Sequence, residues 1–317
     1  MLDVFTFGET MIRFTPPGYS RLEEAVQLDL RIGGTESNVA VALARLGLRV
    51  GWASKLPRNP LGELVARRIR GFDVDVSETC WVESGRIGLY FIEPGAAPRS
   101  SLVLYDRAGS AASTMRPDDF DWTVLDRAGH LHVTGITAAL GADPTATLAR
   151  ALAEARSRGR TVSLDVNYRA RLWSAEAARE TLLPLIRPVD LLIATLDDAV
   201  GVFGAPAAPE EAARALGELT DAPLVALTLG GGGALLWDRS EFHRAEPFPV
   251  QAIDRVGAGD AFDAGLLWGY LRGEPVKGLQ YGMAMAALKH TMPGDEFISS
   301  LAEVETLLHA GHRDIQR

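Results

Sequence analysis

Residues 161–195 read T-V-S-L-D-V-N-Y-R-A-R-L-W-S-A-E-A-A-R-E-T-L-L-P-L-I-R-P-V-D-L-L-I-A-T. The first six and the last six residues are short apolar runs of the kind that form buried strands. Between them, residues 175–187 carry Ala, Leu and Ile at helical spacing. This order predicts two parallel strands joined by a helix, because parallel neighbours need a long crossover connection.

The same alternation extends over most of the chain. Further apolar runs predict strands at 4–8, 131–135 and 223–229. Helical spacing predicts helices at 36–46, 60–70, 144–158, 209–217, 257–272 and 276–290. We therefore predict an α/β fold with a mostly parallel sheet that is covered by helices on both faces.

Two segments depart from this pattern, residues 11–31 and 80–107. They alternate apolar and polar residues, as in I-G-L-Y-F-I-E (87–93), and contain Pro/Gly turns. This pattern predicts antiparallel hairpins that form a small β-sheet lid. The expected α/β core then consists of residues 1–10, 32–79 and 108–317.

Composition narrows the possible partners and compartment. The chain has 317 residues and a formal net charge of −9, which argues against a nucleic-acid partner. A single cysteine, Cys80, excludes an internal disulfide and fits a reducing compartment. Asp3 and Glu9 interrupt any signal-peptide core, and no apolar run is long enough to cross a bilayer. We expect a cytoplasmic protein with no membrane partner.

The segment D-R-V-G-A-G-D-A-F-D-A-G (254–265) carries the strongest chemical signal. Gly257, Ala258 and Gly259 open a helix, so their amides can bind an anion or developing phosphoryl charge. Asp260 would face that anion and could accept a proton from an attacking hydroxyl. Phe262 stands where a dinucleotide fingerprint needs its third glycine, and no Walker-type phosphate loop occurs. A plain glycine-assisted helix start remains the alternative.

A second polar cluster, G-G-T-E-S-N (33–38), precedes an apolar helix that ends at a glycine. Gly33 and Gly34 could offer amides, and Asn38 its side chain, to a polyhydroxylated ligand. Capping of the helix by Thr35 or Ser37 explains the cluster nearly as well.

The two glycine segments, in this order and separation, resemble the signature segments of the ribokinase-like (PfkB) sugar kinases, and the resemblance covers essentially the whole chain. It implies a Rossmann-like domain with a β-sheet lid, and transfer of the γ-phosphoryl of ATP to a sugar hydroxyl with Mg²⁺. By this resemblance Asp260 is the catalytic base, and Gly257, Ala258 and Gly259 form the anion hole.

Four further segments resemble the 2-keto-3-deoxygluconate kinases within that family: G-E-T-M-I-R-F-T-P-P (8–17), Y-D-R-A-G-S-A-A-S (105–113), H-V-T-G-I-T (132–137) and D-V-N-Y-R-A-R-L-W-S (165–174). The resemblance implies that Arg107 and Arg169 hold a substrate carboxylate, which suits the planar guanidinium fork. Tyr90 and Tyr105 would cover the ligand, and Ile136 would line its site. The implied reaction is phosphorylation of the 6-hydroxyl of this sugar acid.

The nucleotide side matches the family less closely. T-L-G-G-G-G-A (228–234) resembles its phosphate turn, with Thr228, Gly230 and Gly233 as candidate contacts, and Asn167 is a further one. T-L-D-D (195–198) stands where the family has N-x-x-E, so Thr195 replaces an amide and Asp198 is the candidate ligand to Mg²⁺ through water. K-H-T-M-P-G-D (289–295) is expected in the wall of the adenine pocket. Whether a monovalent cation sits near Asp254 stays open.

Other interpretations remain. The chain could be a fructokinase- or ribokinase-type enzyme, or a non-catalytic sugar-binding regulator on the same fold. We interpret His130 and His132 as strand-packing residues and Asp263 as solvated or structural. An exposed lid sheet predicts a homo-oligomer that forms through the lid.

Overall fold

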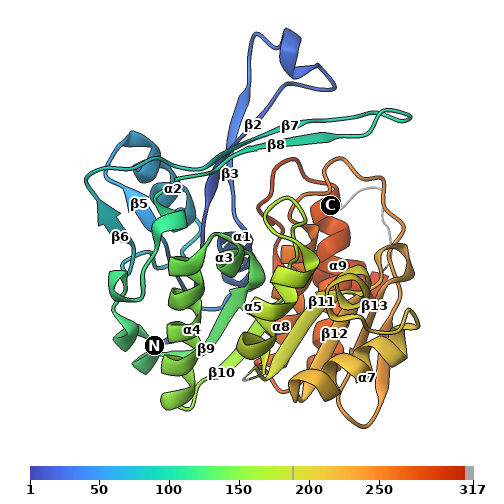
Figure 1. Ribbon diagram of the computed structural model, residues 1–317. Helices are drawn as coiled ribbons and strands as arrows, with labels where there is room; N and C mark the ends of the chain where they lie inside the picture. The colour runs from blue at the N-terminus through green and yellow to red at the C-terminus, as the bar shows by residue number, and fades with distance from the viewer. Residues whose placement is uncertain (188, 311–317) are drawn as a thin grey trace.

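The computed structural model describes residues 1–187 and 189–310. Its main sheet has eight strands in the order β14-β13-β12-β11-β10-β9-β1-β4 (Figure 1). The strands are β1 (Leu2–Phe7), β4 (Val50–Ala53), β9 (Ala128–Thr134), β10 (Thr161–Asp165), β11 (Leu191–Thr195), β12 (Leu224–Thr228), β13 (Ala234–Trp237) and β14 (Phe242–Ala245). All neighbours pair in parallel except β12–β13 and β13–β14, which confirms the mostly parallel sheet.

Helices cover both faces of this sheet. Successive residues of a strand point to opposite faces, so each strand contributes apolar side chains to both helical layers. Leu192 of β11 packs in one apolar layer and its neighbours Leu191 and Ile193 pack in the other. The first layer is formed with α4 (Ala142–Ser157), α5 (Ala175–Ile186), α6 (Leu196–Phe203) and α7 (Pro209–Thr220). The second is formed with α1 (Thr35–Arg45), α2 (Pro60–Arg70), α8 (Ala258–Tyr270), α9 (Pro275–His290) and α10 (Leu301–Ala310).

A second sheet of four strands projects from one end of this core (Figure 1). It contains β2 (Met11–Thr15), β3 (Asp29–Gly33), β7 (Leu89–Glu93) and β8 (Leu102–Asp106), in the order β3-β2-β7-β8. The two outer pairs are antiparallel hairpins, as expected, but β2 and β7 pair in parallel. The predicted antiparallel hairpins are therefore confirmed, and the parallel pairing that joins them is a feature for which the sequence made no prediction.

The structure adds elements that the periodicity did not predict. β6 (Cys80–Val82) pairs with β5 (Lys55–Pro57) in a separate two-stranded sheet, although its residues lie at the start of the expected lid segment. The strands β4, β13 and β14 and the helices α3 (Gly135–Ala139), α6 and α10 were also missed. Apart from α10, these elements have eight residues or fewer, so they offer few residues from which a period can be recognised.

Glycines bring α8 and α9 into backbone contact. A Cβ atom at Gly265 would lie 2.4 Å from the amide nitrogen of Gly282, and one at Gly269 would lie 2.3 Å from the Cα of Gly278. Neither pair therefore has room for a side chain between the helices. The contact fixes α8, whose N-terminus carries the Gly-Ala-Gly segment, against its neighbour.

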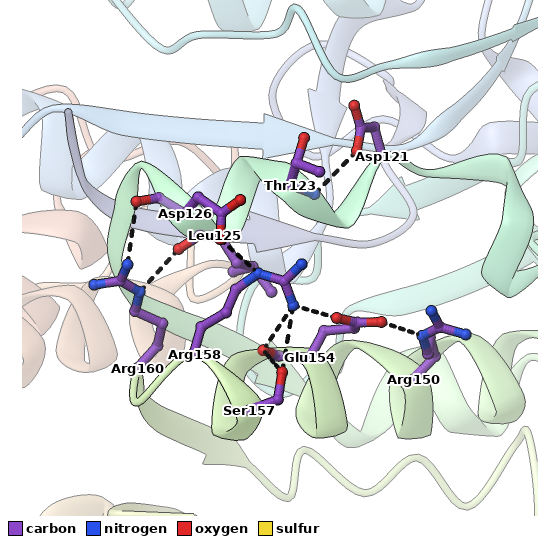
Figure 2. A network of polar contacts seen from close by, with 9 residues as sticks. All are labelled: Asp121, Thr123, Leu125, Asp126, Arg150, Glu154, Ser157, Arg158 and Arg160. Atoms are coloured by element: carbon purple, nitrogen blue, oxygen red, sulfur yellow. Dashed lines mark hydrogen bonds and ion pairs between the residues drawn. The ribbon is translucent and has the colours of Figure 1, made fainter.

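Ion pairs tie the exposed side of α4 to the segment that precedes β9 (Figure 2). Arg158 donates to Asp126 at 2.8 Å and also pairs with Glu154, which accepts from Arg150 at 2.5 Å. Exposed pairs of this kind contribute roughly 0.2–1 kcal/mol each. They therefore reinforce the position of α4 but do not determine the fold.

Within residues 1–187 and 189–310, no helix is both long enough and apolar enough to span a membrane.

Candidate active site

A cavity of about 360 Å³ lies where strands of the main sheet end and the four-stranded sheet begins. Asp165, Thr195 and Thr228 line it from the ends of β10, β11 and β12. Carboxyl ends of parallel strands are the usual position for a ligand site in an α/β sheet. The predicted residues that line it are Gly33, Gly34, Asn38, Tyr90, Tyr105, Arg107, Ile136, Asn167, Arg169, Thr195, Asp198, Thr228, Gly257, Gly259 and Asp260.

Asp260 is a buried carboxylate in the first turn of α8. Its Oδ2 accepts a hydrogen bond of 2.6 Å from Nδ2 of Asn38, so the two signature segments meet at this atom. Burial raises the pKa of Asp260 to about 7, and the bond from Asn38 opposes the rise. A carboxylate with this pKa is suited to accept a proton near neutral pH.

The turn before Asp260 exposes backbone amides to the cavity. Gly257 is the N-cap of α8 and has a φ of +82°, a conformation that favours glycine. A Cβ atom on Gly259 would meet nothing within 4 Å. In residues 1–187 and 189–310, no hydrogen-bond acceptor is found for the amides of Gly257 or Gly259, whereas the amide of Ala258 donates to the carbonyl of Arg255 at 3.4 Å. Ala258 is the one member of this turn that does not line the cavity.

The cluster G-G-T-E-S-N starts α1 without a capping side chain. The N-cap residue is Gly34, and neither Thr35 nor Ser37 caps the helix, so the capping alternative was wrong. Ser37 instead accepts a hydrogen bond of 2.7 Å from Thr10. Glu36 points into the core, where Thr134 donates to it at 2.7 Å. Gly33, Gly34, Thr35 and Asn38 are the members of the cluster that line the cavity.

Two more aspartates lie beside Asp260. Asp263 is buried and lines the cavity together with Asp165, so of our two interpretations the solvated one was wrong and the structural one remains. Burial raises the pKa of Asp263 well above its ordinary value, and the charge of Asp165 adds to the rise. The Asp165 carboxylate receives the backbone amide of Asn167 at 3.1 Å. The floor of the cavity is therefore acidic.

Arg107 and Arg169 approach this acidic cavity from different elements. Nε of Arg107 donates to the buried Glu9 at 2.8 Å, and Ser110 donates to the other oxygen of the same carboxylate. Glu9 therefore orients Arg107, and Nη1 of Arg107 has no acceptor among the described parts of the chain. Arg169 is exposed, and its Nη1 donates to the carbonyl of Tyr168 at 3.1 Å.

Tyr90 is the buried aromatic residue of the cavity. Its ring stacks on Tyr105 with centroids 6.0 Å apart, and its hydroxyl donates to Asp295 at 2.7 Å. Burial raises the pKa of Tyr90 well above its usual range. Gly33 allows this arrangement, because a Cβ atom there would lie 2.0 Å from the tyrosine oxygen.

The candidate nucleotide residues lie along the ends of β10, β11 and β12. Thr195 caps α6 by accepting the amide of Asp198 at 2.9 Å, and burial raises the pKa of Asp198. Oδ1 of Asn167 is buried and has no hydrogen-bond partner within the described ranges. Gly230 and Gly233 lie in the turn between β12 and β13 and are not part of the cavity lining.

Across residues 1–187 and 189–310 there is no group of three or more His, Cys, Asp or Glu side chains arranged to hold a metal. His130 and His132 are both buried. Nδ1 of His130 forms a hydrogen bond with the hydroxyl of Thr161, and Nδ1 of His132 forms one with the hydroxyl of Ser163. Their packing interpretation agrees with this geometry.

The sequence-based prediction missed several residues of the site. The cavity lining also includes Glu9, Asp165, Arg255 and Asp295. Arg13 lies outside the lining and forms an ion pair with Asp295. Glu9 and Arg13 both lie in G-E-T-M-I-R, and Asp295 ends K-H-T-M-P-G-D, so the segments were noticed but these side chains were not assigned a role.

Comparison with known proteins gives a consistent result. The family model described as pfkB family carbohydrate kinase matches residues 1–300. A 2-dehydro-3-deoxygalactonokinase from Haloferax volcanii is 39% identical, with 99% of each chain covered. The crystal structure of a 2-dehydro-3-deoxygluconokinase from Thermotoga maritima superposes with a TM-score of 0.91 at 38% identity, covering 96% of this chain and 98% of that one. A putative ribokinase II from E. coli, solved with ATP and Mg²⁺, shares the fold with a TM-score of 0.87 at 21% identity over 97% of this chain and 99% of that one.

Proposed function

Because this chain belongs to the pfkB family of carbohydrate kinases and is therefore a phosphotransferase with an alcohol group as acceptor, we propose that it phosphorylates the 6-hydroxyl of 2-keto-3-deoxygluconate with ATP. The product is 2-keto-3-deoxy-6-phosphogluconate. One observation carries the choice of substrate: Arg107 and Arg169 line the same cavity as the buried Asp260. A neutral sugar offers no group that would use two guanidinium side chains, whereas a sugar acid offers its carboxylate.

Asp260 is the proposed general base. It accepts the proton of the 6-hydroxyl, and Asn38 holds the carboxylate in place through its bond of 2.6 Å. The free amides of Gly257 and Gly259 face the charge that develops on the transferred group. Arg107, oriented by Glu9, binds the substrate carboxylate together with Arg169. Tyr90 and Tyr105 cover the sugar and exclude water.

The residues present fit ATP and Mg²⁺. The acceptor-free amides at the start of α8 suit a phosphate, and the orphaned Oδ1 of Asn167 together with Asp198 suits a cation held through water. The E. coli relative solved with both groups supports this assignment. When bound, ATP supplies the phosphoryl group and Mg²⁺ neutralises charge on its phosphates. Thr228 is the proposed contact on the β12 side, with Gly230 and Gly233 in the adjoining turn.

The 4-epimer, 2-keto-3-deoxygalactonate, is the second candidate substrate. The Haloferax relative, named for that sugar acid, supports it. Both epimers carry the same carboxylate and the same 6-hydroxyl, so Arg107, Arg169 and Asp260 do not distinguish them. Fructose and ribose lack the carboxylate and are weaker candidates.

ADP release over a panel of sugars and sugar acids tests the proposal. The wild-type chain should turn over 2-keto-3-deoxygluconate with a kcat/KM at least about 100-fold above those for fructose and ribose, since the charge-assisted bonds of two arginines together contribute about 3–6 kcal/mol. Asp260→Asn serves as the control for contaminating kinases, because it keeps the shape of the site and removes the base. A higher kcat/KM for fructose or ribose would reject the sugar-acid assignment.

We also propose that two copies associate through the four-stranded sheet. Leu102, Leu104 and Tyr105 of β8 are large apolar residues that remain exposed in the single chain. Light scattering of Leu104→Lys, compared with the wild-type chain, tests this association.

A further inference from the structure

A buried arginine joins the four-stranded sheet to the two loops beside the anion hole. Arg13 lies on β2 with a side chain that is 4% exposed. Its Nη2 donates to Asp254 at 2.6 Å, its Nη1 donates to Asp295 at 2.7 Å, and its Nε donates to Thr15 at 2.9 Å. All three guanidinium nitrogens therefore have acceptors, and the guanidinium bridges two carboxylates.

Each of the four oxygens of these two carboxylates already accepts a hydrogen bond. Besides Arg13, Asp254 accepts the amides of Val256 at 3.1 Å and Gly294 at 3.0 Å. The second oxygen of Asp295 accepts the hydroxyl of Tyr90 at 2.7 Å. A monovalent cation needs several oxygen ligands that do not already accept strong hydrogen bonds, so the residues present do not fit a cation beside Asp254.

The charge of the cluster is also balanced without an ion. Lys289 is completely buried, and its ammonium group donates to the carbonyl of Met292 at 3.1 Å. Burial lowers the pKa of Lys289, and the carboxylates of Asp254 and Asp295 oppose that change, which indicates that they lie close enough to interact. Arg13 and Lys289 thus offset the two aspartates, and a further cation would leave the cluster with excess positive charge.

The position of this cluster explains why it matters for the anion hole. A Cβ atom on Gly257 would lie 2.1 Å from the carbonyl oxygen of Asp295, so the turn of the anion hole rests directly on the loop that Arg13 holds. Asp254 precedes the same turn by three residues. Any displacement of the two aspartates would therefore move the amides of Gly257 and Gly259.

We propose that Arg13 is a positioning residue that does the work of a monovalent cation, holding Asp254 and Asp295 together beside the anion hole, so that this protein needs no K⁺ or Na⁺. The stability part of this inference stands on the cluster alone, and the activity part rests on the proposed kinase function. The tests of the two parts can be separated.

Thermal unfolding tests the stability part without substrate. Wild-type protein should have the same Tm, within about 1 °C, in KCl, NaCl and tetramethylammonium chloride of equal ionic strength. Arg13→Met should lower the Tm by at least about 5 °C, because it leaves two buried carboxylates without their partner. KCl should then raise the Tm of the variant above its value in tetramethylammonium chloride.

Arg68→Ala is the matched control. Arg68 also forms a two-point ion pair to the same loop, with Glu296 at 2.7 and 3.1 Å, but it is 47% exposed and lies outside the cavity lining. Its variant should respond equally to the three salts. If Arg13→Met does not fold, Arg13→Lys is measured by the same criteria, since lysine keeps the charge and loses the fork.

Kinase assays in the same salts test the activity part. The wild-type rate should change less than twofold among the three salts, and the rate of Arg13→Lys should fall at least about tenfold and recover in part with KCl. A wild-type Tm or rate that depends specifically on K⁺ or Na⁺ would overturn the inference, and so would an Arg13 variant that behaves like Arg68→Ala. Absence of kinase activity in every salt would count against the proposed function and leave the Tm result to decide the role of Arg13.

Discussion

Replacement of Asp260 by asparagine should stabilise the protein and inactivate it at the same time. Asp260 is buried, and its pKa rises from an ordinary 3.8 to about 7, chiefly because burial disfavours the charged form. At about 1.4 kcal/mol per pH unit, this difference corresponds to about 4 kcal/mol of unfolding free energy. Asparagine removes the charge and still offers an oxygen to Nδ2 of Asn38, so the variant should recover most of that energy.

The difference in unfolding free energy between Asp260→Asn and the wild type depends on pH, because the pKa of Asp260 differs between the folded and the unfolded state. Below pH 3.8 Asp260 is protonated in both the folded and the unfolded state, so variant and wild type should differ little. Between pH 3.8 and 7 the folded state holds the proton more tightly, and the wild type loses stability as pH rises. Above pH 7 the loss is complete. The stability gained by Asp260→Asn should therefore grow with pH and level off near 4 kcal/mol.

Urea unfolding of both proteins from pH 4.5 to 8.5 measures this difference, and ADP release at pH 8 measures the activity. The variant should lose about 10²–10⁴-fold in kcat, the usual contribution of a general base. Asp238→Asn is a control of opposite sign, because the amides of Glu241 and Ser240 lower the pKa of Asp238. The lowered pKa stabilises the folded wild type fully above pH 3.8, so Asp238→Asn should be less stable than the wild type by an amount that stays constant from pH 4.5 to 8.5. A stability difference at Asp260 that is independent of pH, or a variant that keeps more than about a tenth of the rate, would refute the reasoning.

Three further predictions concern the substrate, the anion hole and the metal. Arg169→Ala should raise the KM for 2-keto-3-deoxygluconate about 10–100-fold and leave any residual KM for fructose unchanged, as steady-state assays would measure. Gly257→Ala should lower the Tm by several degrees and the rate by more than about 100-fold. The φ of Gly257 is +82°, and the new Cβ would lie 2.1 Å from the carbonyl oxygen of Asp295. A variant with wild-type Tm and rate would contradict this. Asp198→Asn should raise the Mg²⁺ concentration for half-maximal rate about tenfold or more, and an unchanged Mg²⁺ titration would remove Asp198 from the metal site.

The core of the fold could be predicted because its signals are local. The apolar runs that became β10 and β11 and the helical spacing of α2 each depend on fewer than a dozen neighbouring residues. The expected helix at 60–70 coincides with α2 (Pro60–Arg70). The parallel pairing of β2 with β7 could not be predicted in this way. Those strands are joined by more than seventy residues, and no pattern within either one specifies its partner.

The same distinction applies to the site. Asp260 and the Gly-Ala-Gly turn stand together in one short segment, so the sequence alone indicated an anion hole with a base. Arg13 reaches Asp254 across 241 positions and Asp295 across 282 positions, and such a contact exists only once the chain has folded. The bond between Glu9 and Arg107 is equally non-local. Glu9, Arg13 and Asp295 were therefore seen only as parts of motifs, and their partners could not be predicted.

The glycine contacts between α8 and α9 extend the active site beyond its lining. Gly269 lies nine residues after Asp260, which is about 14 Å along the helix axis at about 1.5 Å per residue. A methyl group at Gly269 would meet the Cα of Gly278, and α8 would have to move as a stiff rod that carries Asp260 and its amides along. The position of Asp260 relative to a substrate hydroxyl therefore depends on packing at the opposite end of the helix, outside the cavity lining. Substitutions in this helix–helix contact can therefore change kcat without changing any residue that contacts the substrate.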